Sequence, residues 1–296
     1  MTPSPERESA ALVALLRVGH RPSSVYADLV ERDGSALAVL ERELDEPAGQ
    51  GSLLAVDPGP LIARAAAEID AWNAAGLQLV TVFDARYPAN LRAVHDRPPL
   101  IFLRGAVLAA DARAVSVIGS RRASEQGLAT ATAISEHLIA NHYTVVSGLA
   151  SGIDAAAHTA ALRARGRTIA VIGTGLARCY PPEHEALQRE IGERGAVVSQ
   201  FWPDTPPGAH TFPLRNVTMS GASLATVVVE ASQTSGARIQ ARRALAHGRT
   251  VFLSRAVLGQ PWARELARRP GVHVVDSPAQ ITDATERLFA AGALID

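Results

Sequence analysis

The chain has 296 residues with 47% hydrophobic and 20% charged residues, a composition typical of a packed protein and not of a disordered one. Its formal net charge is zero, and its single cysteine, Cys179, excludes an internal disulfide framework and a cysteine-rich zinc site. No apolar run approaches the roughly 20 residues of a membrane span and no secretory signal opens the chain, so we expect a cytoplasmic protein without membrane contact.

The first sixty residues are predicted to form a small helical domain. Apolar residues recur at helical spacing between Ser9 and Leu44, and the segment 19–22 interrupts the first helix. The segment 46–51 contains proline and two glycines and is typical of a loop at a domain boundary. We therefore expect a small helical domain at residues 1–60 and a larger α/β domain at residues 61–296.

The larger domain is predicted to alternate strands and helices. A helix at residues 61–75 precedes strands at 77–82 and 100–103. Further strands are predicted at 115–118, 143–147, 168–172, 197–199, 224–229 and 250–253, with helices at 125–140, 155–164 and 183–194. Short hydrophobic runs separated by helices indicate a parallel sheet that is covered on both faces. The expected fold class is α/β, a Rossmann-like, doubly wound and mostly parallel sheet.

Small, polar and basic residues follow four of the predicted strands, at 119–122, 147–154, 173–176 and 230–232. The carboxyl ends of parallel strands meet at one edge of a sheet, where ligands bind. Glycine lets a phosphate approach the backbone, and the Ser120 hydroxyl and Arg121 guanidinium add donors. Three further polar residues at this edge have a structural role as the alternative to ligand contact. Asp154 can cap the helix that follows it, His158 can lie on a helix surface, and Glu230 can form a structural hydrogen bond. The segments 212–216 and 220–223 are expected in a loop near this edge.

Charge is unevenly distributed along the chain. Residues 112–260 contain 15 arginines and 9 acidic residues, whereas the remainder contains 14 arginines and 20 acidic residues. The sequence has no lysine, so every fixed cation is a guanidinium, the group that pairs with phosphate in bidentate geometry. A GC-rich genome also explains the missing lysines, but the segregation places a positive field on the predicted α/β domain.

Several enzyme classes fit the sequence poorly. The dinucleotide fingerprint G-x-G-x-x-G is missing from the first strand–helix turn, and the phosphate-loop motif needs a lysine that the chain lacks. The histidines show no H-x-x-x-H pair, and Cys179 has no neighbouring base. We expect no catalytic residue, no cofactor and no metal site.

The ordered motifs resemble those of the DprA/Smf family of DNA-processing proteins. The resemblance extends over residues 10–255 and is carried by the segments 76–82, 98–105, 117–122, 145–158, 166–176, 180–184, 212–216 and 227–231. It implies a non-enzymatic protein that binds single-stranded DNA during DNA uptake or recombination, loads the RecA recombinase and dimerises through the Rossmann-like domain. It also implies that the N-terminal helices form a domain like the sterile alpha motif.

By this resemblance and the strand-end pattern, one set of residues is predicted to contact DNA or phosphate. These candidates are Gly119, Ser120, Arg121, Arg122, Gly148, Gly152, Asp154, Phe212, Arg215, Asn216, Arg238 and Arg242. Non-specific strands are held in this way by arginines and helix N-termini that contact phosphates.

The chain lacks basic residues at two positions of the family pattern. Ser151 and Val217 occupy positions where the family usually has basic residues, and Arg238 and Arg242 are the candidate replacements. Two missing phosphate contacts are expected to weaken strand binding and flatten its salt dependence. The alternative is a nucleotide-sensing Rossmann-type regulator, for example a defence-associated one, that binds a free nucleotide in place of a DNA strand.

Overall fold

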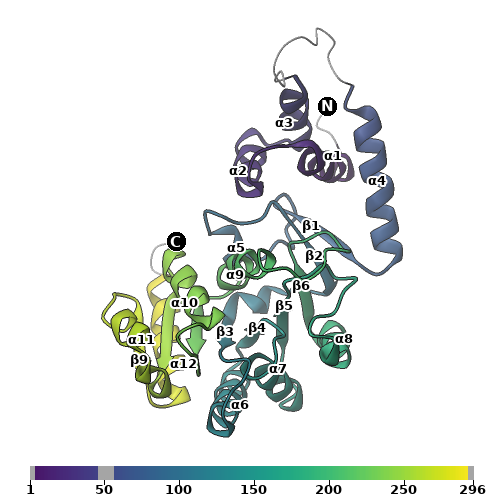
Figure 1. The fold of residues 1–296 in the computed structure, drawn as a ribbon. Coiled ribbons are helices and arrows are strands. Elements are labelled where there is room, and N and C mark those ends of the chain that lie inside the picture. The colour runs from purple at the N-terminus through teal and green to yellow at the C-terminus, as the bar shows by residue number, and fades with distance from the viewer. Residues whose placement is uncertain (1–3, 46–56, 293–296) are drawn as a thin grey trace.

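The computed structural model describes residues 4–45 and 57–292 (Figure 1). The predicted boundary loop at residues 46–51 lies outside the described residues. The N-terminal segment is helical, as predicted, with α1 (Pro5–Val18), α2 (Ser23–Asp33) and α3 (Ala36–Asp45). Ser4 caps α1 by accepting a hydrogen bond from the Arg7 amide.

Helix α4 (Gly59–Ala74) connects the two parts of the molecule. It packs against α1 and also contacts the first strand of the sheet (Figure 1). The predicted division at residue 60 falls within the first turn of α4. Because α4 packs on α1, this helix contributes to the helical part as much as to the α/β part, and the division at residue 60 stays a prediction.

In the described part of the chain, nine strands form one sheet in the order β1-β2-β6-β5-β4-β3-β7-β8-β9. Strand β2 runs antiparallel to both of its neighbours, and the other pairs are parallel. The strands are β1 (Gln78–Thr81), β2 (Leu100–Gly105), β3 (Ala114–Ile118), β4 (Thr144–Ser147), β5 (Thr168–Val171), β6 (Ala196–Ser199), β7 (Ala225–Val228), β8 (Thr250–Ser254) and β9 (Val272–Val275).

Helices cover both faces of the sheet. They are α5 (Ala89–Arg92), α6 (Glu125–Ala140), α7 (Ile153–Arg163), α8 (Glu185–Arg194), α9 (Thr211–Gly221), α10 (Gly236–Ala246), α11 (Pro261–Leu266) and α12 (Pro278–Gly292). Helix α6 packs on α7 and α12, whereas α9 packs on α10. Neighbouring residues of one strand accordingly enter different cores, with Val117 in one apolar cluster and Ile118 in the other. The predicted Rossmann-like, mostly parallel α/β fold is confirmed.

None of the helices in the described ranges combines the length and apolar character that a membrane crossing requires.

The prediction was wrong for segments near the carboxyl end of the sheet. Residues 212–216 and 220–221 are not a loop but part of α9, whose first turn contains Pro213. Proline is accepted there because the first amides of a helix have no intrahelical partner. The sequence pattern also failed to predict α10, α11, β9 and α12, whose apolar stripes are interrupted by arginines and other polar residues.

Candidate functional site

The four polar strand ends meet at one edge of the sheet, as predicted. Strands β5, β4, β3 and β7 are consecutive in the sheet and mutually parallel. At the carboxyl ends of β3, β4 and β7 lies a cavity of about 460 Å³, here called the strand-end pocket, whereas the predicted segment 173–176 after β5 does not line this cavity. Its lining includes Ile118, Gly119, Ser120, Arg121, Arg122, Ala150, Asp154, Phe212, Arg215, Asn216, Met219, Ser232, Thr234, Ser235, Gly236, Ala237 and Gln240.

Most of the predicted site residues line this pocket. Gly148 lines an adjoining cavity of about 170 Å³, which shares Arg121, Phe212 and Arg215 with the strand-end pocket and also contains Ser151 and Tyr180. Gly152, Arg238 and Arg242 line neither cavity. The two arginines that the sequence offered as replacements for missing cations therefore lie on α10 outside the pocket lining.

Two predicted glycines shape the backbone of the pocket. Gly152 has a φ of 80°, which side-chain-bearing residues rarely adopt, and a Cβ there would overlap the Ser120 carbonyl oxygen. A Cβ at Gly148 would overlap the Arg215 guanidinium. Both glycines thus permit close packing within the protein, which is a structural role besides any approach of a ligand.

Arg215 is built into the floor of the pocket. Its side chain is only 7% exposed, and Nη1 donates to the carbonyl oxygens of Gly148 (2.8 Å) and Val171 (2.7 Å). Nε donates to Asn216 Oδ1 at 3.2 Å. Burial lowers the pKa of Arg215, and the negative charge of Asp154 opposes that shift. Arg215 therefore joins the ends of β4 and β5 to α9.

Asp154 is the buried acidic partner of this arginine. Its Oδ2 accepts a hydrogen bond from the Gly148 amide at 3.2 Å. Burial raises the pKa of the carboxyl, and the positive charge of Arg215 counteracts this increase. The carboxylate thus holds the loop between β4 and α7, and the helix itself begins after Gly152 without a side-chain cap.

The exposed Arg121 and the partly buried Phe212 form a cationic wall of the pocket. The Arg121 guanidinium lies 5.2 Å from the centre of the Phe212 ring, and the centroids of the Tyr180 and Phe212 rings are 5.8 Å apart. In the described ranges neither Arg121 nor Arg122 forms an ion pair with a carboxylate, and both side chains are exposed. Tyr180 was not among the predicted site residues, although it is the first residue of the segment 180–184 that carries the family resemblance.

The helix N-termini at this edge differ in whether they are free to bind an anion such as phosphate. Glu230 occupies the start of α6, where Oε1 and Oε2 accept the Ser124 amide at 3.1 and 3.2 Å and Oε2 accepts the Ser124 hydroxyl at 2.5 Å. The Glu230 carboxylate would repel a phosphate at this helix N-terminus. Helix α10 instead begins with Ser235, Gly236 and Ala237, which line the pocket, and it has no acidic residue in its first turn. Its positive end is therefore directed toward the pocket.

Glu230 is expected to stabilise the protein through this cap. Replacing Glu230 with glutamine should lower the free energy of unfolding by about 1 kcal/mol, because the charge-assisted hydrogen bonds from the Ser124 amide and hydroxyl are weakened. Denaturant unfolding measures the effect. The matched control is Glu125→Gln, which removes another first-turn acid of α6. Equal effects in the two variants would contradict a specific role for Glu230.

Two reactive residue types near the pocket lack the features of catalysts. His158 is fully buried in α7, not on its surface, and Nδ1 pairs with Thr168 Oγ1 at 2.7 Å. Burial lowers the pKa of His158 to about 3, so the ring is neutral at physiological pH. Burial also raises the pKa of the Cys179 thiol, which disfavours the nucleophilic thiolate. His158 is thus a core residue, and the surroundings of Cys179 do not activate it.

These features define a class: a Rossmann-like protein with a polar, arginine-lined pocket at the carboxyl edge of its sheet. Comparison with known sequences gives the family. The model for DNA recombination-mediator protein A matches residues 78–290, and the chain belongs to this family. The resemblance to DprA/Smf proteins is thereby confirmed.

Curated relatives agree with this assignment. The chain is 41% identical over 172 residues to the DNA processing protein DprA of Streptococcus pneumoniae, covering 58% of this chain and 61% of that protein. It is 38% identical over 200 residues to the protein Smf of Escherichia coli, covering 67% of this chain and 54% of that protein. The matched region thus spans less than two thirds of either relative.

Solved structures support the fold. The X-ray structure of DprA from Streptococcus pneumoniae matches with a TM-score of 0.71 at 28% identity, covering 96% of this chain and 98% of that one. The DNA processing protein A of Helicobacter pylori matches with a TM-score of 0.63 at 23% identity, and the study of that structure concerns its single-stranded DNA binding mode. That alignment covers 71% of this chain and 96% of the other.

Proposed function

We propose that this chain is a cytoplasmic, non-enzymatic protein that binds single-stranded DNA through the strand-end pocket and acts in DNA uptake or recombination. The observation that carries the proposal is the cluster of the exposed Arg121 and Tyr180 side chains around the partly buried Phe212 ring. A cation beside aromatic rings provides both a phosphate contact and a base-stacking surface, the combination by which proteins hold single strands without reading sequence. The curated relatives are named as DNA-processing proteins, which supports DNA as the ligand class.

Substituting both exposed arginines, Arg121→Ala with Arg122→Ala, is expected to weaken binding of labelled oligo-dT by roughly 10- to 100-fold at low salt. The slope of log affinity against log salt should flatten by roughly 0.7 for each phosphate that is no longer neutralised. Fluorescence anisotropy at two or more salt concentrations measures both quantities. The control is Arg64→Ala, because Arg64 is 82% exposed on α4 and lines no part of the pocket.

The rival function is binding of a free nucleotide by a regulatory protein. The pocket volume of about 460 Å³ suits a ligand of nucleotide size, and Ser151 adds no charge beside it. Competition of oligo-dT with a mononucleotide separates the two functions. Absent strand binding together with retained mononucleotide affinity would overturn the DNA proposal.

Two partners follow from family membership and belong to the same proposal. A second copy of the chain would double the length of strand held, and RecA would receive the bound strand. Light scattering of the purified chain tests the homodimer. Assembly of RecA on oligo-dT that is already covered by a single-strand-binding protein, with and without this chain, tests the loading role.

A further inference from the structure

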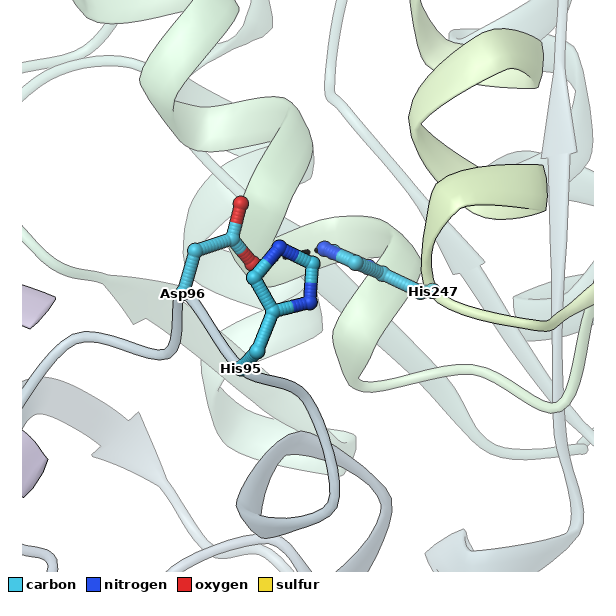
Figure 2. A group of neighbouring side chains, drawn as sticks. All are labelled: His95, Asp96 and His247. Carbon is cyan, nitrogen blue, oxygen red and sulfur yellow. Dashed lines mark hydrogen bonds and ion pairs between the residues drawn. The ribbon is translucent and has the colours of Figure 1, made fainter.

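Two histidines and an aspartate from distant parts of the chain meet beside α10 (Figure 2). His95 and Asp96 lie between α5 and β2, and His247 is the residue that ends α10. One ligand atom from each side chain lies within 4.8 Å of the others. The His95 and His247 rings meet edge to face at 5.6 Å between centroids. Sequence spacing gave no sign of this cluster, because Asp96 and His247 are 151 positions apart.

Both ring nitrogens of His247 lie at hydrogen-bond distance from a protein oxygen. Nδ1 lies 2.8 Å from the Ser220 hydroxyl, and the donor in this pair depends on the tautomer of the ring. The same hydroxyl lies 2.8 Å from the carbonyl oxygen of Asn216, which is a second acceptor for its proton. Nε2 lies 2.7 Å from Oδ1 of Asp96. In the tautomer with the proton on Nδ1, the Nε2 lone pair and the Asp96 carboxylate are both available to one cation.

The surroundings of Asp96 resemble the outer contacts of a metal ligand. Arg243 Nη1 donates to Asp96 Oδ2 at 2.9 Å, which orients the carboxylate so that Oδ1 faces His247. Metal-bound histidines donate the N–H of their second ring nitrogen to a protein oxygen, and Ser220 Oγ lies 2.8 Å from Nδ1 of His247, where it can serve as that acceptor. The exposed ring of His95 adds a third donor atom, which a bridging proton does not require.

We propose that His95, Asp96 and His247 form a binding site for Zn²⁺ or a similar borderline divalent cation. Two imidazole nitrogens and one carboxylate oxygen form a donor set that Zn²⁺ uses, with water completing the coordination. Zn²⁺ about 2.0 Å from each donor separates neighbouring donors by about 3.3 Å. That separation lies between the 2.7 Å of the Nε2–Oδ1 pair and the 4.8 Å limit of the cluster.

A cation in this site would connect the segment before β2 to the end of α10. Ser220 belongs to α9 and bonds both His247 and the backbone of Asn216, a residue of the strand-end pocket. A bound cation would thus hold together elements that surround the pocket. The expected consequence of binding is stabilisation of the folded protein and not catalysis.

The test uses the untagged, metal-free full chain and ZnCl₂, with calorimetric titration for stoichiometry and thermal unfolding for stability. We expect one Zn²⁺ per chain and, at a hundredfold excess over Kd, a rise in Tm of about 5 °C. His95→Ala should weaken Zn²⁺ binding by about tenfold or more while leaving the metal-free Tm unchanged, since His95 is exposed. Ser220→Ala removes the oxygen that lies 2.8 Å from Nδ1 of His247 and should weaken binding by about tenfold, because the ring loses this orienting contact.

Three controls separate this site from others. His20→Ala removes an exposed histidine of the N-terminal helices and should leave Zn²⁺ affinity unchanged. Cys179→Ser should also have no effect, and the visible spectrum of the Co²⁺-substituted chain should lack the thiolate charge-transfer band. MgCl₂ should give no rise in Tm. No Zn²⁺ bound to the wild-type chain, or equal affinity in His95→Ala, would overturn the proposal and leave a proton between His247 and Asp96.

Discussion

Replacing Arg215 with methionine is expected to lower the free energy of unfolding by about 3–5 kcal/mol. The substitution keeps much of the side-chain volume but removes the donors that the carbonyl oxygens of Gly148 and Val171 use. It also leaves the buried Asp154 without the positive charge that opposes its desolvation. Denaturant unfolding, with circular dichroism to confirm the native fold, measures the decrease.

The size of this decrease should depend on pH. Burial raises the folded-state pKa of Asp154 above 3.8, and without Arg215 it rises further. A carboxyl with a raised folded pKa destabilises the protein increasingly as the pH rises through that value. The difference in stability between wild type and Arg215→Met should therefore be smallest at about pH 4 and grow toward about pH 8.

A double-mutant cycle with Asp154→Asn separates the effect of charge from the effect of the hydrogen bonds. In the Asp154→Asn background the pH dependence of the Arg215→Met effect should disappear, whereas a pH-independent destabilisation from the two carbonyls should remain. A destabilisation below about 1 kcal/mol, or one without pH dependence in the wild-type background, would contradict a structural role for Arg215. Because of this role, reduced DNA binding by Arg215 variants alone is weak evidence for a DNA contact.

The sequence was informative where a single pattern determined the structure. Hydrophobic runs of the central strands predicted a parallel sheet, and parallel strands necessarily bring the residues after β3, β4, β5 and β7 to one edge. The position of the pocket and the part of its lining that follows β3, β4 and β7 resulted from that rule, whereas α9 and the first residues of α10 supply the rest of the lining. Such a pattern does not report burial of a polar side chain, so Arg215 and the exposed Arg121 looked equivalent.

The features that the sequence did not predict depend on contacts between distant segments. Helix α9 was expected to be a loop, yet Pro213 stands in the first turn of this helix, where proline is compatible with helical structure. Glu230 occupies the start of α6 from more than a hundred positions away. The cluster of His95, Asp96 and His247 likewise depends on the packing of α10 against the segment before β2. No local spacing contains that information.

The two cations missing from the family pattern differ in a way that only the structure reveals. Ser151 is half-buried and lines the cavity next to the strand-end pocket, together with Arg121 and Tyr180. Val217 is 6% exposed on α9 and lines neither cavity. A positive charge at position 151 therefore reaches the proposed strand, whereas one at position 217 enters the interior of the protein.

Restoring the two charges should consequently have opposite results. Ser151→Lys is expected to tighten oligo-dT binding by about tenfold at low salt and to steepen the salt slope by roughly 0.7, because one more phosphate is neutralised. Val217→Arg is expected to lower the free energy of unfolding by at least about 3 kcal/mol, since it buries a charge without a partner, and to leave affinity no tighter. Anisotropy titrations and denaturant unfolding measure the two effects.

Ser151→Gln is the matched control, because it adds length and polarity without charge and should change neither the affinity nor the salt slope. If Ser151→Lys left oligo-dT binding unchanged while Val217→Arg tightened it, the strand would contact α9 from a side other than the strand-end pocket. If Ser151→Lys tightened mononucleotide binding but produced no strand binding, the free-nucleotide function would be favoured. Because the salt slope counts phosphate contacts, it separates a strand that crosses several phosphates from a single nucleotide that offers few.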